Sequence, residues 1–177
     1  MDVLHLDINI VSPLFTIASR ILHFGNDQFP TYTYVKTNAQ KSDLEQSESL
    51  YLKSLLKFCP TIPDLTQMPG NFFRKFSSEE NKDLILKPLP ECEAKHKFAA
   101  VMDLWRRIRR THKSSNPTAA AVDDYPNLVK QFLTLLDKDF PWFKPLPNQF
   151  HRLTHSSYFL NNDRNDRNYT TKIQSSS

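Results

Sequence analysis

The strongest concentration of residues able to do chemistry is the arginine-rich run 106–110, Arg106-Arg107-Ile108-Arg109-Arg110. With about 100° of rotation per helical residue, several of its cations fall on the side opposite an apolar stripe that includes Trp105. Such an exposed basic face can lie along nucleic-acid phosphates or pair with an acidic partner, and salt would weaken the binding. The alternatives are a solvated helix face and a nuclear-localisation signal. The cations expected to carry binding are Lys95, Arg106, Arg107, Arg110 and Lys113.

Two pairs of residues have the chemistry of zinc ligands at i,i+4 spacing, Cys92 with His96 and His151 with His155. On two helices these pairs could meet around one zinc ion. Neither pair has an established zinc spacing, and Cys92 and His96 share the helix side of the basic face, away from the expected core. We therefore expect surface histidines and a half-buried thiol, and predict neither a metal nor another cofactor.

Aromatic residues and prolines alternate in the segment 140–147, Phe-Pro-Trp-Phe-Lys-Pro-Leu-Pro. Prolines exclude a helix here, and large aromatic side chains are costly to leave in water. The segment either closes the end of the helical core or docks on a protein partner, because aromatic residues dominate interface energetics. The residues predicted for partner binding are Phe140, Trp142, Phe143 and Leu146.

Glycine is scarce, with only Gly25 and Gly70 in the chain. Phosphate-binding loops, dinucleotide fingerprints and the G-x-S-x-G nucleophile elbow need closely spaced glycines, so these enzyme classes are improbable. The adjacent Asp123 and Asp124 cannot both face one point on a helix, and a capping role suits them better. We expect a protein that is not an enzyme and has no evident small-molecule substrate.

The composition indicates a folded protein with polar margins. The 177 residues carry a net charge of +4, and 39% are hydrophobic and 12% aromatic. Two cysteines are too few for a disulfide framework, which favours a reducing compartment. The N-terminus lacks the basic start of a secretory signal, and no apolar run approaches the ~20 residues of a membrane span. The expected location is the nucleus or the cytoplasm, with no membrane partner.

The periodicity of apolar residues predicts a mainly α fold, an irregular bundle of four to six helices with extended Pro-rich connections and a disordered C-terminal tail. Alternating Leu4, Leu6, Ile8 and Ile10 instead suggest a short strand or an extended lead-in. Helices are expected over 13–24 with Gly25 as the C-terminal glycine, from the capping box at Ser42 to Cys59, from Ser77, over 91–112, after a cap at Asp123 or Asp124, and from Asn148 to Tyr158.

One helical domain is expected over residues 1–160, followed by a flexible polar tail over 161–177 whose composition cannot bury enough apolar area. The predicted core residues are Leu14, Ile17, Ile21, Leu52, Leu55, Leu56, Phe98, Met102, Trp105, Leu128, Phe132 and Leu136. The favoured function is a non-catalytic interaction subunit or adaptor of a larger assembly in the nucleus or the cytoplasm. The alternative is a DNA- or RNA-binding protein that uses the basic helix 91–113.

Overall fold

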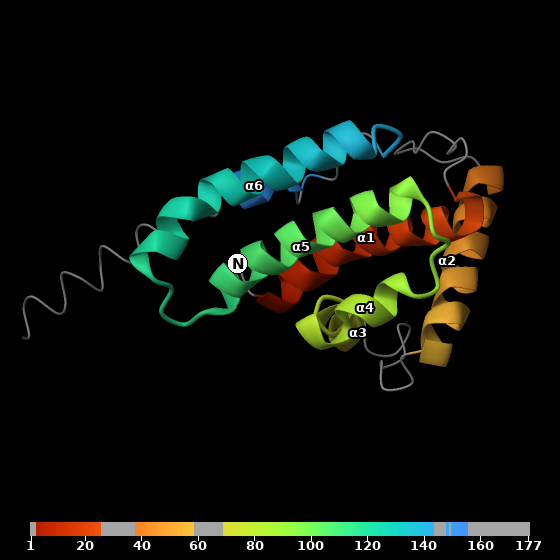
Figure 1. Cartoon of the computed structure of the whole chain (residues 1–177), viewed down its shortest axis with the longest axis horizontal. Helices are drawn as coiled ribbons and strands as arrows, with labels where there is room; N and C mark the ends of the chain where they lie inside the picture. Colours follow the sequence, from red (N-terminus) through yellow and green to blue (C-terminus); the bar gives the residue numbers. More distant parts are fainter. Residues whose placement is uncertain (1–2, 26–37, 59–68, 144–147, 149, 156–177) are drawn as a thin grey trace, which may run out of the picture.

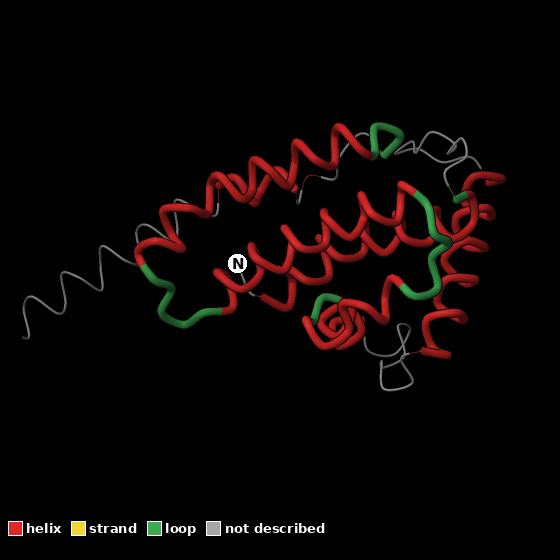
Figure 2. The backbone as a smooth tube through the Cα atoms, in the orientation of Figure 1, coloured by secondary structure: helices red, strands yellow, loops and turns green. Residues whose placement is uncertain are grey.

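The structure, a computed structural model, describes residues 3–25, 38–58, 69–143, 148 and 150–155, and within these ranges it is helical without strands (Figures 1 and 2). The predicted mainly α fold is confirmed. Of the predicted Pro-rich connections, the segment 87–92 with Pro88 and Pro90 is described, whereas 59–68, 144–147 and the predicted tail lie outside the described residues. The elements in chain order are α1 (Val3–Phe24), α2 (Asn38–Phe58), α3 (Pro69–Phe76), the 3₁₀ helix η1 (Glu79–Asn81), α4 (Lys82–Leu86), α5 (Glu93–Lys113) and α6 (Ala119–Asp139).

Helix α1 is the centre of the bundle and packs against α2, α3 and α5. Every residue from Leu14 to Ile21 is buried, so this part of the helix is covered on all sides. The expected strand at residues 4–10 is wrong, because α1 begins at Val3 and runs through Pro13. Alternating apolar residues over a short segment do not by themselves distinguish a strand from a helix. Gly25 ends the helix as predicted, with a φ of 63°.

No helix was predicted for α3, whose first two residues are Pro69 and Gly70. Proline suits the first turn of a helix, and Pro69 occupies the first position of α3. The helix buries its three phenylalanines against Phe15 of α1 and Tyr51 of α2, with ring centroids 5.3–6.4 Å apart. This aromatic cluster joins α1, α2 and α3 into one layer of the core.

Helices α5 and α6 form the second layer, with α5 beside α1 and α6 lying along α5 (Figure 1). Trp105 of α5 packs against Phe132 of α6 with the ring centroids 6.3 Å apart. The Trp105 indole N–H donates a hydrogen bond to Ser77 Oγ at 3.1 Å. The expected cap at Asp123 or Asp124 is wrong. Thr118 caps α6 instead, since its side chain accepts a hydrogen bond from the Ala121 amide at 3.1 Å. The small alanine run therefore belongs to the helix.

Other helix boundaries differ from the sequence expectation by a few residues. Helix α2 begins at Asn38, so Ser42 lies inside it, and the expected short helix at Ser77 begins as η1 at Glu79. Helix α5 matches the predicted long helix within two residues at its start and one at its end. The predicted core is buried except at Leu52, which is half-buried, and at Leu56, which is 41% exposed.

Candidate functional site

The predicted basic face of α5 is not a single exposed surface. Arg106 is only 4% exposed, and the expectation that it faces water is wrong. Helix α5 therefore buries a wider arc than the apolar stripe indicated, and Glu79 of η1 and Asp83 of α4 are near enough to Arg106 to act on it electrostatically. The Arg106 guanidinium donates to Asp103 at 3.2 Å, while its Nε and Nη2 atoms have no hydrogen-bond partner among the described residues. Burial lowers the pKa of Arg106 from its ordinary value.

The other predicted cations of α5 face acidic side chains or the surface. Arg110 pairs with Glu79 at 3.0 Å, and Arg107 lies 3.8 Å from Asp124, with both arginine side chains at least half exposed. Lys95 pairs with Glu91 one helical turn earlier, and Lys113 is exposed at the end of the helix. The positive charge of α5 is therefore largely compensated within the protein.

A buried ion pair that the sequence did not reveal joins the start of α1 to the end of α5. Both Arg109 and Asp7 are more than nine-tenths buried, and the guanidinium donates two hydrogen bonds to the carboxylate, at 2.6 and 2.9 Å. This two-point geometry is the strongest form of an arginine–carboxylate contact. No local pattern could indicate it, because the partners are 102 residues apart in the chain. One arginine of the predicted basic run is thus a structural residue.

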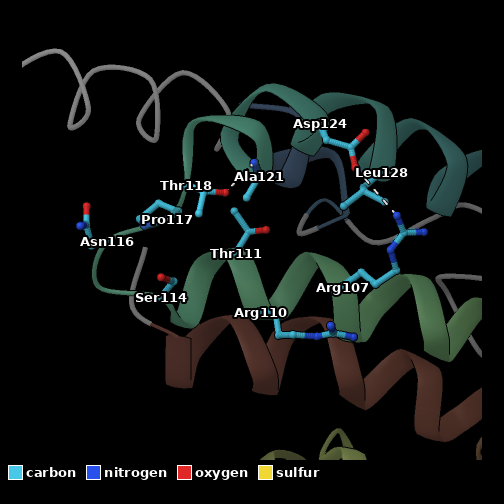
Figure 3. Close-up of a pocket in the computed structure, with 10 residues that line it drawn as sticks. All are labelled: Arg107, Arg110, Thr111, Ser114, Asn116, Pro117, Thr118, Ala121, Asp124 and Leu128. Atoms are coloured by element: carbon cyan, nitrogen blue, oxygen red, sulfur yellow. Dashed lines mark hydrogen bonds and ion pairs between the residues drawn. The ribbon is translucent and has the colours of Figure 1, made fainter.

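A polar cleft opens where the end of α5 meets the start of α6 (Figure 3). Its volume is about 330 Å³, and its walls include Arg107, Thr111, Ser114, Thr118 and Asp124. The Arg107 side chain reaches across from α5 toward Asp124 of α6, while that of Arg110 extends along α5 away from α6 (Figure 3). Arg107 is a binding residue predicted from the sequence, whereas none of the hydroxyl groups around it was predicted.

The aromatic segment after α6 belongs mainly to the core. Phe140 and Phe143 are each 1% exposed, so the structure supports the core-closing alternative for them and not the expected partner contact. Trp142 is half-buried and packs edge-on against both phenylalanines, with centroids 6.2 and 6.0 Å away. Leu146 lies outside the described residues. The Phe140 and Phe143 rings therefore close the end of the core between α5 and α6.

The two histidines near the end of the described chain lie side by side on the surface. His151 and His155 are both exposed, and their ring centroids are 5.2 Å apart. Between them Leu153 is fully buried, and Phe150 stacks on Phe132 of α6 at 5.8 Å with the ring planes 7° apart. The short helical segment 150–155 is therefore fixed to the core through one face while it presents both imidazoles on the other.

A hydrogen-bonded chain also connects this segment to α5 and α6. The Tyr125 hydroxyl lies 2.6 Å from Nε2 of His112 and 3.4 Å from the Leu153 carbonyl oxygen. Burial lowers the pKa of His112 to about 4, so its imidazole is neutral at physiological pH. The chain of contacts holds the backbone between the two exposed histidines.

The four-ligand zinc hypothesis of two joined i,i+4 pairs does not match the described geometry. His96 lies 3.7 Å from Glu91 on its own side of α5, and among the described residues no three histidine, cysteine, aspartate or glutamate side chains are placed to hold one metal ion. Of the two predicted pairs, only His151 and His155 have both side chains exposed and adjacent. Cys92 is half-buried.

Two further findings bear on the class of protein. Across the helices that the structure describes, none combines the length and apolar character needed to cross a membrane. Residues 1–163 match the protein family described as the Recombination-activation protein 1 (RAG1) ZnH2 domain. The match takes in every residue that the structure describes.

Proposed function

The chain belongs to the RAG1 ZnH2 domain family, and we propose that it is a helical module of a nuclear, recombination-type protein assembly that contributes two histidines to a zinc site. The observation that carries the proposal is the exposed His151–His155 pair on a segment fixed to the core. The family name combines zinc with "H2", which agrees with a pair of histidine ligands. This proposal includes the interaction role expected from the sequence, because the zinc ion would join the chain to its partner.

The histidine pair fits zinc in ligand type and spacing. Zinc takes imidazole nitrogens readily, and residues four apart on a helix are neighbours on one face. A structural zinc site needs four ligands, and this pair supplies two. The remaining two would come from residues outside the described ranges or from another segment of the assembly. Zinc, when bound, would supply a cross-link between segments.

The surroundings of the pair favour a preformed half-site. Leu153 and Phe150 anchor the segment, and the Tyr125 hydroxyl contacts its backbone. Metal sites gain affinity when the ligands are held in place by a second layer of contacts. The chain would then bring ordered histidines to its partner.

Metal binding by the intact chain tests the proposal. Cobalt(II), which reports its coordination through visible absorption, would be titrated into the wild-type chain and then displaced with zinc. His151→Ala and His155→Ala should each weaken binding by about tenfold or more, since each removes one of two ligands. His96→Ala is the matched control, because His96 is a 74% exposed helical histidine without a paired imidazole.

Equal binding by the wild type and by both ligand variants would contradict the zinc proposal. Since the histidines are exposed, the variants should keep the thermal midpoint of the wild type without metal. Loss of binding through unfolding would therefore be recognised in the same samples by circular dichroism.

Nucleic-acid binding is the second candidate function, and the family description as a recombination-activation protein favours it. Arg107 and Arg110 are the exposed arginines of the predicted basic face. Ion pairs at exposed positions contribute about 0–1 kcal/mol, so phosphate groups could replace the carboxylates. Duplex and single-stranded DNA and RNA at ~50 and ~200 mM salt would test it. Arg107→Ala/Arg110→Ala should reduce binding, and the charge-matched control is Lys53→Ala/Lys57→Ala on α2.

We also propose that the chain by itself is not an enzyme. Arg109 neutralises the buried Asp7, and within the described part of the chain no cluster of metal-binding side chains forms. A nicking assay on supercoiled DNA with Mg²⁺ or Mn²⁺ tests this point, and cleavage above background that is lost in an Asp7 variant would contradict it.

A further inference from the structure

The cleft between the end of α5 and the start of α6 has the features of a ligand site that the zinc proposal does not use. Its volume of about 330 Å³ lies at the lower end of the ~300–1,000 Å³ range of small-ligand sites. Six of the ten residues that line it carry side-chain hydrogen-bond donors, namely Arg107, Arg110, Thr111, Ser114, Asn116 and Thr118, while Pro117, Ala121 and Leu128 add apolar wall. The donors suit a small hydrogen-bond acceptor.

Thr111 is the most informative residue of the cleft. It is only 7% exposed, yet it lines the cleft, and its side chain points from α5 into the space between the two helices (Figure 3). Its hydroxyl makes no hydrogen bond with the described residues, whereas Thr16 and Ser19, on another helix, donate to carbonyls one turn earlier. The hydroxyl is reachable from the cleft, so a ligand there would supply an acceptor for it.

Arg107 places positive charge in the same space. Its guanidinium lies 3.8 Å from the Asp124 carboxylate, a distance that is too long for a hydrogen bond. The N–H donors are thus not used up by this pair, and Arg107 lines the cleft. Arg110, by contrast, is engaged with Glu79 at 3.0 Å and extends away from α6. One of the two arginines is therefore available to a ligand in the cleft.

The start of α6 adds a second source of positive potential. Thr118 caps the helix at the edge of the cleft, and the amide of Ala121 is already satisfied by that cap. The N-terminal end of a helix carries a partial positive charge that favours anions. Asp124 opposes an anion in this position, and its removal should strengthen binding. That opposing charge gives the site a distinctive response to substitution.

We propose that this cleft binds a phosphate group, held by the Arg107 guanidinium and the Thr111 hydroxyl at the start of α6. Phosphate oxygens accept charge-assisted hydrogen bonds from arginine and further bonds from hydroxyl groups, which are the donors present. The group is either a free phosphate or a phosphodiester of a nucleic-acid strand. The inference is independent of the zinc proposal, because the cleft contains no histidine.

Titration of the ¹⁵N-labelled chain with inorganic phosphate, at constant ionic strength against chloride, tests the site through the amide signals of Thr111 and Ala119 to Ala121. Arg107→Gln should weaken binding by about tenfold or more, and Thr111→Val by about fivefold, since a charge-assisted hydrogen bond contributes more than a neutral one. Thr111→Ser, which keeps the hydroxyl, should stay within about twofold of the wild type. Asp124→Asn should bind severalfold more tightly.

Arg74→Gln is the matched control, since it removes the same charge from an exposed arginine of α3 that does not line the cleft, and it should change binding by less than about twofold. A second titration uses a short oligothymidylate without terminal phosphates. The same order of variants with the oligonucleotide identifies a phosphodiester as the source, and an effect of inorganic phosphate alone identifies free phosphate.

The proposal is overturned if neither probe shifts these amides, or if Thr111→Val and Asp124→Asn both bind like the wild type. The valine variant has the shape of threonine, so a folded spectrum is expected and its result can be interpreted. Because no step involves His151 or His155, failure of the zinc experiment and failure of this one are separate outcomes.

Discussion

The buried ion pair between Asp7 and Arg109 gives the sharpest test of how the bundle is held together. Asp7→Asn keeps the size of the side chain but leaves the Arg109 guanidinium more than nine-tenths buried without a counter-charge. Removing one partner of such a pair costs roughly 3–5 kcal/mol, because the remaining charge stays away from water unpaired. Two hydrogen bonds, at 2.6 and 2.9 Å, support a value within this range.

The expected loss is a large part of the total stability, which for a domain is about 5–15 kcal/mol. For a chain of this size each kcal/mol lowers the thermal midpoint by about 2–4 °C, so Asp7→Asn should lower it by roughly 6–20 °C. Urea unfolding followed by circular dichroism would give the free energy of unfolding directly. The double variant Asp7→Leu/Arg109→Met should recover most of the loss, since it removes both charges at once.

The exposed pair between Arg110 and Glu79 is the control for this prediction. Its side chains are 68% and 58% exposed, and Glu79→Gln should cost at most about 1 kcal/mol. Equal losses for Asp7→Asn and Glu79→Gln would refute the reasoning. So would a double variant that is less stable than Asp7→Asn, because it would show that the ion pair is not where the energy resides.

Three other perturbations test individual contacts in the two layers. Burial lowers the pKa of His112 to about 4 from its ordinary 6.5. As the pH falls, the imidazole is therefore protonated in the unfolded chain before it is protonated in the folded one. The free energy of unfolding should be at its full value above pH 6.5 and fall by about 3 kcal/mol as the pH drops toward 4. Urea midpoints across this range should depend less on pH in His112→Asn, and an unchanged slope would contradict the assignment. Thr118→Ala should cost about 1 kcal/mol by thermal unfolding as the α6 cap, while Asp124→Ala should not show a capping loss. Tyr51→Phe removes a buried hydrogen bond of 2.6 Å to the Ile85 carbonyl. Urea unfolding should show a loss of about 1–3 kcal/mol in the free energy of unfolding. A loss below about 0.5 kcal/mol would contradict a stabilising role for this bond.

Local patterns in the sequence were sufficient for the helices with a clear apolar stripe. The long helix α5 and the end of α1 at Gly25 follow from spacing and from glycine chemistry, which depend on neighbours in the chain. The start of α1 and all of α3 did not follow. Alternating apolar residues over 4–10 are typical of a strand, and the Pro69-Gly70 start of α3 is typical of an irregular segment, so the local pattern pointed away from a helix in both cases.

The candidate sites show the same division in their chemistry. The sequence identified the i,i+4 histidines and the arginine run, because these depend on residue type and spacing along one helix. It could not separate the arginines by environment. Arg106 and Arg109 are buried while Arg107 and Arg110 are exposed, and that division is set by η1, α4 and the distant Asp7.

The amino-acid sequence by itself determined a mainly helical chain with few glycines, one strongly basic helix and a closely spaced histidine pair. Tertiary structure alone decided which charges are compensated, which aromatic rings close the core and where a polar cleft opens. The physical reason is range: helix propensity and spacing act over a few residues, whereas burial and ion pairing depend on contacts between segments as far apart as Asp7 and Arg109.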